Sequence, residues 1–182
     1  MGPLWGRVRV RAAVRPLAAR RFIQNFAAGA LFLVLLHCFV VQISVVRGHS
    51  MEPSLWDGDR LLVDRLSYSI MDVGRFDVVV LRYPVDPSVD FVKRIVGLPG
   101  ERIRIDHGSI LVNGLALPNA FKYVPDRAEM TEILVPAAEY FVLGDNRPIS
   151  CDSREFGLVP KAFLKGKVRA RFWPPARARV FP

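Results

Sequence analysis

The chain has 182 residues, 51% of them hydrophobic, which suits one domain of about 100–200 residues plus a short apolar segment. The formal net charge of +9 belongs to the two ends, because residues 1–25 hold six arginines and residues 161–182 hold seven basic residues, both without an acid. The residues between them hold 13 basic and 17 acidic side chains, so the folded part lacks the basic surface of a nucleic-acid-binding protein, and we expect no nucleic-acid partner.

An uncharged apolar segment covers residues 26–46 and is interrupted only by mildly polar positions. A membrane-spanning helix needs about 20 apolar residues, and a soluble helix is usually amphipathic, which this segment is not. We therefore predict a single transmembrane anchor over 26–46, preceded by a basic cytoplasmic tail over 1–25, because positive flanks stay on the cytoplasmic side. A cleaved signal peptide is the alternative, but residues 45–49 contain no small-x-small cleavage site. The rest of the chain, 47–182, would then lie across the membrane.

After residue 55 the sequence changes to short runs rich in Val, Leu, Ile and aromatic residues, bounded by Gly, Pro or Asp, which is the pattern of β-strands. Helical periodicity is scarce in this part. Frequent Gly and Pro between many short strands favour a mainly β domain with irregular connections. The predicted strands cover residues 60–64, 77–83, 91–96, 102–105, 109–112, 132–135, 140–143 and 168–172.

Three polar motifs accompany this pattern. The first begins two residues after the apolar segment and places Ser50 where the chain would leave the membrane. The second places Lys93 in the strand predicted over 91–96, on the same face as Phe91 and Ile95. The third offers polar groups that can orient a catalytic side chain. The motifs are Gly48-His49-Ser50-Met51-Glu52-Pro53-Ser54-Leu55, Lys93-Arg94-Ile95-Val96-Gly97-Leu98-Pro99-Gly100, and Gly144-Asp145-Asn146-Arg147 followed by Ser150-Cys151-Asp152-Ser153-Arg154.

Ser50 is a candidate nucleophile, and a serine hydroxyl needs a base that takes its proton. His49 is the obvious base, but adjacent residues in an extended segment point to opposite sides, which argues against a Ser-His-Asp triad. A neutral lysine can serve instead if burial lowers its pKa from about 10.4 to about 7–8. Lys93 has apolar neighbours that favour such burial, whereas two solvated surface charges at Lys93 and Arg94 are the alternative. Together the motifs suggest a serine–lysine peptidase.

In their order and spacing the three motifs resemble those of type I signal peptidases, the membrane-anchored serine proteases that remove signal peptides from exported proteins. The resemblance spans the apolar segment and most of residues 47–173. It implies an antiparallel β catalytic domain behind a single N-terminal transmembrane helix, with a small variable insertion at 107–138, a basic C-terminal tail at 161–182, and neither cofactor nor metal. The implied partners are signal-peptide-bearing preproteins, membrane lipid and the protein-export machinery. The implied location is the bacterial cytoplasmic membrane, with the catalytic domain on the extracytoplasmic side.

The resemblance also implies a role for each motif. Ser50 would be the nucleophile, and Lys93 the general base that later protonates the leaving amine. Ser150 would hydrogen-bond the lysine nitrogen. The Ser50 backbone amide would be the first oxyanion donor. Some family members add a serine hydroxyl two positions earlier, where this chain has Gly48, so the second donor is unassigned.

Charged residues of the second and third motifs would shape the loop that supports these groups. We expect Asp145 to pair with Arg94, and Asp152 to pair with Arg154. The substrate would bind as an extended strand beside the segment before Ser50, with shallow apolar pockets that direct cleavage after Ala-x-Ala. The residues that would contact it are Asp90, Phe91, Val92 and Met51.

Two alternatives to a bacterial signal peptidase stay open. A membrane-anchored binding or scaffold protein would keep an inactive peptidase fold. A mitochondrial inner-membrane peptidase fits the arginine-rich, acid-free N-terminus, which also resembles a transit peptide. The stretch from Lys165 to Arg179 is equally compatible with two roles, namely contact with anionic lipid through its charges and through Phe172 and Trp173, and a solvated tail.

Overall fold

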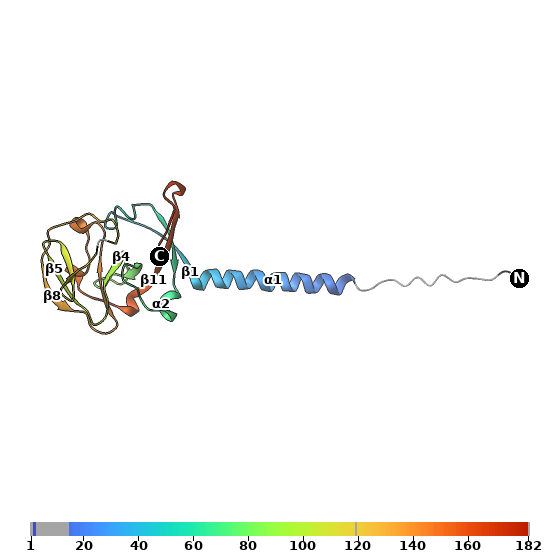
Figure 1. Ribbon diagram of the computed structural model, residues 1–182. Coiled ribbons are helices and arrows are strands. Elements are labelled where there is room, and N and C mark those ends of the chain that lie inside the picture. Colours follow the sequence, from blue (N-terminus) through green and yellow to red (C-terminus); the bar gives the residue numbers. More distant parts are fainter. Residues whose placement is uncertain (1, 3–14, 119, 182) are drawn as a thin grey trace. The chain divides into compact units, whose positions relative to one another are not determined.

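The structure is a computed structural model that describes all residues except 1, 3–14, 119 and 182. The chain divides into two compact units, Met1–Cys38 and Phe39–Pro182, each of which is described by itself. The described part of the first unit is helical, and the second contains every described strand (Figure 1).

The first unit is built on helix α1 (Arg15–Val40). The side chains of residues 19–34 are all exposed, and they include a run of large apolar ones at 31–34 that covers most of the helix circumference. Among the described helices, none reaches the length and apolarity that a bilayer span requires. Residues 1 and 3–14 of the predicted tail fall outside the described residues, as do the side chains of residues 35–39 in the predicted anchor, whereas residues 15–25 of that tail belong to α1.

The helix predicted over 26–46 is wrong at its C-terminal end. α1 ends at Val40, and the chain continues as strand β1 (Val41–Val45), which pairs along its whole length with β2 (Arg60–Asp64). The segment is rich in β-branched residues, which favour a strand, and β2 supplies partners for its backbone groups. The sequence did not reveal this strand, because residues 41–45 continue the apolar run that was predicted as a helix.

The second unit contains two sheets. The large sheet adds to β1 and β2 the strands β3 (Val78–Arg82), β4 (Asp90–Gly97), β9 (Glu139–Leu143), β10 (Val159–Pro160), β11 (Leu164–Trp173) and β12 (Arg179–Val180). The small sheet comprises β5 (Arg102–Asp106), β6 (Ser109–Val112), β7 (Leu115–Ala116) and β8 (Met130–Leu134). Short helical turns are α2 (Ser67–Ile70), η1 (Arg147–Ile149), α3 (Ser153–Phe156), η2 (Lys161–Phe163) and η3 (Pro175–Arg177).

The strand order brings distant parts of the chain together. The large sheet has the order β1-β2-β11-β3-β4-β9-β10 with β12 paired to β11, and the small sheet has the order β7-β6-β5-β8. All of these pairings are antiparallel. β11 therefore lies between β2 and β3, so the stretch predicted as a tail over 161–182 contributes two strands, β11 and β12, to the large sheet.

Both faces of the large sheet are covered by apolar side chains. Val78 and Val80 of β3 pack in one buried cluster with Met51 and Leu55 of the first motif. The intervening Val79 and Leu81 pack in a second cluster on the opposite face. A third cluster joins β4 and β9 to the small sheet. Burial on both faces explains the unbroken apolar run at residues 78–81.

The predicted strands are confirmed, with differences of a few residues at their ends. Residues 107–138, predicted as a small variable insertion, contain β6, β7 and β8 of the small sheet. The strands that were not predicted are β1, hidden in the apolar segment, and the two-residue pairings β7, β10 and β12, which are too short for a detectable pattern.

Candidate functional site

Ser50 lies in the loop between β1 and β2, which we call the nucleophile loop (residues 46–59). Its base is closed by a hydrogen bond from the Val46 amide to the Asp59 carbonyl at 2.8 Å. Directly after Ser50 the chain forms a turn in which the Leu55 amide donates to the Met51 carbonyl, also at 2.8 Å. Both of these side chains are buried in the core, so packing fixes the turn that presents Ser50.

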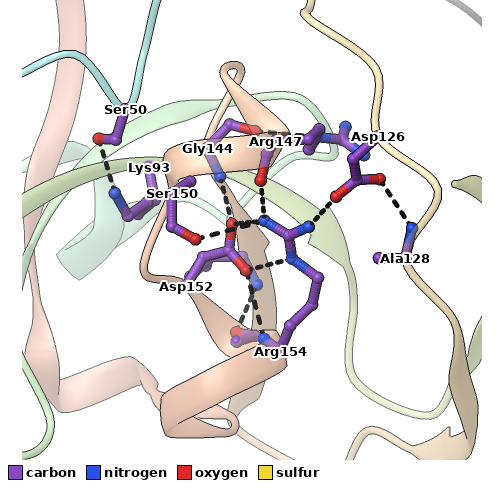
Figure 2. Close-up of polar contacts among 11 residues, drawn as sticks. Ser50, Lys93, Asp126, Ala128, Gly144, Arg147, Ser150, Asp152 and Arg154 are labelled. Atoms are coloured by element: carbon purple, nitrogen blue, oxygen red, sulfur yellow. Dashed lines mark hydrogen bonds and ion pairs between the residues drawn. The ribbon is translucent and has the colours of Figure 1, made fainter.

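Lys93 reaches Ser50 from β4, and Figure 2 shows the contact. The Nζ atom of Lys93 hydrogen-bonds Oγ of Ser50 at 2.8 Å. Lys93 is only 3% exposed, and its Nζ lies 5.0 Å from the centroid of the Phe91 ring. Burial lowers the pKa of Lys93 from 10.5 to about 8, although Asp152 and other nearby acidic groups act in the opposite direction. The structure thus combines the distance and the lowered pKa that a lysine base needs.

His49, the rival base, has another partner. Its Nδ1 lies 2.7 Å from Oε1 of Glu52, and the hydrogen bond to this carboxylate raises the pKa of His49. The ring is well exposed. Within the described chain no hydrogen bond joins His49 to Ser50, so the geometry favours Lys93 as the base.

The Ser150 hydroxyl does not make the predicted hydrogen bond to Lys93. Its Oγ is buried and has no hydrogen-bond partner among the described residues. The side chain is directed at Gly144 instead, where an added Cβ would collide with both Ser150 Oγ and the Ser50 carbonyl oxygen. Glycine is therefore required at position 144, and the bond between Ser150 and the lysine nitrogen stays a prediction.

The predicted pair of Arg94 with Asp145 is present. The Arg94 guanidinium donates to the carboxylate from Nε at 2.8 Å and from Nη2 at 2.6 Å, and Asp145 is fully buried. The amide of the following residue, Asn146, donates to the Ser50 carbonyl at 2.9 Å. The ion pair thus connects the strand that carries Lys93 to a loop that holds the nucleophile.

The predicted pair of Asp152 with Arg154 is also present (Figure 2). Nε and Nη2 of Arg154 each donate to a different carboxylate oxygen at 2.8 Å. Nη2 also donates to the carbonyls of Arg147 at 2.7 Å and Ser150 at 3.3 Å. The Gly144 amide donates to the same carboxylate at 3.0 Å. These contacts hold the residues of the third motif around the buried carboxylate of Asp152.

The sequence did not identify two further residues of this network, Asp126 and Arg147. Asp126 forms an ion pair with Nη1 of Arg154. Arg147 is buried, donates from Nε to the Gly144 carbonyl at 2.9 Å, and lies over the Tyr123 ring at 4.7 Å. Asp126 lies between the second and third motifs and belongs to neither, so no sequence pattern marks it. Arg147 is part of the third motif, but nothing in the sequence shows that its charge is buried.

The two backbone amides that were considered as oxyanion donors differ in their contacts. In the described part of the chain the Ser50 amide donates to no acceptor, which leaves it available to a developing negative charge. Gly48 has a φ of 88°, a conformation that favours glycine, and its amide donates to the Asp57 carboxylate at 2.8 Å. Gly48 therefore offers neither a side chain nor a free amide, and it is not the second donor in this geometry.

A groove of about 600 Å³ opens beside Ser50 and Lys93. One side is formed by β1, which pairs only with β2, and the other by the first residues of β4, which pairs with β9 only from Arg94 onward. Both sides therefore present unpaired strand edges, to which an extended peptide can add. The groove is lined by the predicted contact residues Asp90, Phe91, Val92 and Met51, together with others including Ile43, Val45, Ile149 and Cys151. The described residues include no cluster of three or more potential metal ligands.

Comparisons with known proteins identify the family of the chain. The family described as signal peptidase, peptidase S26, matches residues 19–173. A probable signal peptidase I-2 of Synechocystis sp. is 35% identical over 160 residues, covering 85% of this chain and 73% of the relative. A signal peptidase I of Leptolyngbya laminosa is 34% identical over 177 residues, covering 91% and 87%.

Two further similarities are to proteins of Staphylococcus aureus and Enterococcus faecalis. A signal peptidase IB of Staphylococcus aureus is 30% identical over 171 residues, covering 84% of this chain and 88% of the relative. A crystal structure of a signal peptidase I from Enterococcus faecalis is 33% identical and covers 54% of this chain and 97% of that one, with a TM-score of 0.44. The chain therefore belongs to the signal peptidase family, peptidase S26, and is a serine endopeptidase of the signal peptidase I type.

Proposed function

We propose that this chain removes signal peptides from exported preproteins with Ser50 as nucleophile and Lys93 as general base. The observation that carries the proposal is the 2.8 Å contact between Lys93 Nζ and Ser50 Oγ, at a buried position that lowers the pKa of Lys93 to about 8. Neutral Lys93 takes the hydroxyl proton as Oγ attacks the scissile carbonyl, and the resulting ammonium gives a proton to the leaving amine, which leaves an ester on Ser50. Lys93 then takes a proton from a water that attacks this ester, and the proton returns to Oγ as the signal peptide leaves as a carboxylic acid. The free Ser50 amide supports its role as the first oxyanion donor.

We assign the Ser150 hydroxyl to the lysine nitrogen as an orienting group. The hydroxyl is buried, close to Gly144 and the Ser50 carbonyl, and has no partner in the described structure. Leaving such a group unpaired costs about 1–3 kcal/mol, and a hydrogen bond to the Lys93 amine would remove that cost. The buried ion pairs of Asp145 and Asp152 support the loop that carries this hydroxyl.

The substrate binds as an extended strand between the two unpaired edges of the groove. Hydrogen bonds to its backbone hold the scissile bond beside Ser50, while alternate side chains face the groove lining. Exposed apolar residues of β1, Ile43 and Val45, lie on one side, and Phe91 of β4 lies on the other. A shallow apolar lining of this kind supports cleavage after Ala-x-Ala.

The test is cleavage of a preprotein with an Ala-x-Ala site by the detergent-solubilised full chain. We expect Ser50→Ala to be inactive and His49→Ala to retain wild-type activity, because the His49 ring is bound to Glu52. Loss of activity in His49→Ala, combined with activity in Lys93→Ala, would show that His49 and not Lys93 is the general base. Binding of the preprotein without cleavage by the wild-type chain would favour the scaffold alternative.

The same proposal places the chain in the bacterial cytoplasmic membrane, where preproteins arrive through the export machinery. The exposed apolar side chains of α1 support a membrane anchor, and the arginines before it support a cytoplasmic N-terminus. The exposed Phe172 and Trp173, close to several arginines, support contact with anionic lipid. The bacterial origin of the relatives favours this location over a mitochondrial one.

This location is tested in spheroplasts of a bacterial host that produces the full chain. Alkaline carbonate should leave the chain in the membrane pellet, and added protease should digest the unit Phe39–Pro182. Release by carbonate would contradict the anchor. Protection from the protease would contradict the orientation.

A further inference from the structure

The C-terminal part of the chain contacts the nucleophile loop directly. Arg171 lies near the end of β11 and is 8% exposed. Its Nη1 donates to Oδ2 of Asp59 and to the Ser54 carbonyl, both at 2.9 Å. Both acceptors belong to the loop that carries Ser50, although more than a hundred residues separate them from Arg171 in the sequence.

Asp59 is the centre of these contacts. Its carboxylate is fully buried and accepts hydrogen bonds from Arg171, from Nη2 of Arg177 at 2.7 Å, and from the Trp56 amide at 2.9 Å. Its own carbonyl accepts the Val46 amide that closes the base of the loop. Arg171 is oriented in turn by a bond from its Nε to the Arg177 carbonyl at 2.6 Å. The C-terminal segment thus holds the second half of the nucleophile loop.

The second motif contacts the same part of the loop. The Ser54 hydroxyl lies 3.4 Å from Nη2 of Arg94, while the Ser54 carbonyl is bound by Arg171. Arg94 of β4 and Arg171 of β11 therefore both contact Ser54. Ser54 lies in the turn that directly follows Ser50, which is closed by the bond from the Leu55 amide to the Met51 carbonyl. We therefore expect a displacement of Ser54 to shift Ser50, whose hydroxyl lies 2.8 Å from Nζ of Lys93.

We propose that Arg171 is a positioning residue for the peptidase reaction, acting through Asp59 and Ser54 on the placement of Ser50. The inference rests on the function proposed above. Arg171 does not line the substrate groove, so its loss should act on kcat and leave KM nearly unchanged. A misplacement of a reacting group by about 1 Å can cost about 10²-fold in rate.

The test uses the full chain with Arg171→Ala, for which we expect kcat to fall by about 100-fold at nearly constant KM. The substitution leaves a space bordered by the Asp59 carboxylate and the Ser54 carbonyl, both of which bind guanidinium in the wild type. Millimolar guanidinium should therefore restore a large part of kcat. Arg102→Ala is the matched control, because Arg102 is exposed and pairs with Glu132 in the small sheet. This control should keep wild-type kcat and should not respond to guanidinium.

Thermal unfolding of each variant separates positioning from folding. If Arg171→Ala does not fold at the assay temperature, Arg171→Lys is measured instead, since it keeps the charge near Asp59 but not the fork that binds two acceptors. Its kcat should be intermediate. Wild-type kcat in the substituted chain, or a loss that follows only the folded fraction and is not restored by guanidinium, would overturn the positioning role. Cleavage by the wild type and none by Ser50→Ala would leave the proposed function intact in that case, whereas no cleavage by the wild type would overturn both.

Discussion

Lys93→Met is expected to lower the kcat of preprotein cleavage by about 10²–10⁴-fold and, at neutral pH, to raise the free energy of unfolding. Activity falls because Ser50 loses the base that lies 2.8 Å from its hydroxyl. Stability rises because burial lowers the pKa of Lys93 from 10.5 to about 8, so that near pH 7 the folded chain holds a charge that the unfolded chain solvates better. A shift of this size corresponds to roughly 3 kcal/mol as an upper value. Methionine has a similar length and carries no charge.

The sign of this stability difference sets its pH dependence. Between the folded pKa of about 8 and the ordinary value of 10.5, the unfolded chain binds more protons at Lys93 than the folded chain, so the stability of the wild type rises with pH. Below this window Lys93 is protonated in both the folded and the unfolded chain, so the buried ammonium destabilises the folded chain to its full extent. The advantage of Lys93→Met should therefore shrink as the pH rises through the window.

Urea unfolding at several pH values measures this difference. Lys122→Met is the matched control, because it makes the same chemical change at an exposed lysine and should leave the free energy of unfolding near pH 7 almost unchanged. If Lys93→Met were less stable than the wild type near pH 7, burial of the charged lysine would not destabilise the folded chain. Burial would then not explain the lowered pKa of Lys93.

Asp145→Ala is expected to lower the free energy of unfolding by about 3–5 kcal/mol, because it leaves a buried arginine without its carboxylate. Arg94 would keep only weaker partners, namely the Phe76 carbonyl at 2.9 Å, the Phe121 ring at 4.1 Å and the Ser54 hydroxyl at 3.4 Å. The same change loosens the loop whose next amide holds the Ser50 carbonyl, so cleavage should fall as well.

Urea unfolding at neutral pH measures the effect, with Glu132→Ala as control. Glu132 forms an exposed ion pair with Arg102, and such pairs contribute about 0–1 kcal/mol. A loss of stability in Asp145→Ala no larger than that in Glu132→Ala would show that the buried pair does not hold the site together.

Local patterns predicted most of the second unit. Alternating or continuous apolar runs between Gly, Pro and Asp identify β2 to β6, β8, β9 and β11, because the pleat repeats every second residue. The contact between Ser50 and Lys93 was predicted from the resemblance of the three motifs to those of type I signal peptidases, because the apolar neighbours of Lys93 favour its burial but are also compatible with two solvated charges at Lys93 and Arg94. The pairs of Arg94 with Asp145 and of Asp152 with Arg154 were expected from opposite charges within the motifs, but the sequence does not fix the partners, and the structure supplies them.

Features that depend on tertiary contacts were not predictable. β1 is apolar enough to continue a helix and becomes a strand because β2 pairs with it. Asp126 enters the network because the segment around Val124 forms a bridge to Asn146, which leaves no local trace in the sequence. Arg171 resembles a residue of a solvated basic tail until β11 is inserted between β2 and β3, where its guanidinium meets Asp59.

The pH dependence of kcat/KM for preprotein cleavage tests the serine–lysine account most directly, because this ratio reports the titration of the base in the free enzyme. We predict that kcat/KM rises with pH as Lys93 loses its proton, follows an apparent pKa of about 8, and then levels off. His49→Ala should give the same profile. A rise centred near the histidine pKa of about 6.5 that disappears in His49→Ala would contradict the account, as would a rise centred near the ordinary lysine value of about 10.4.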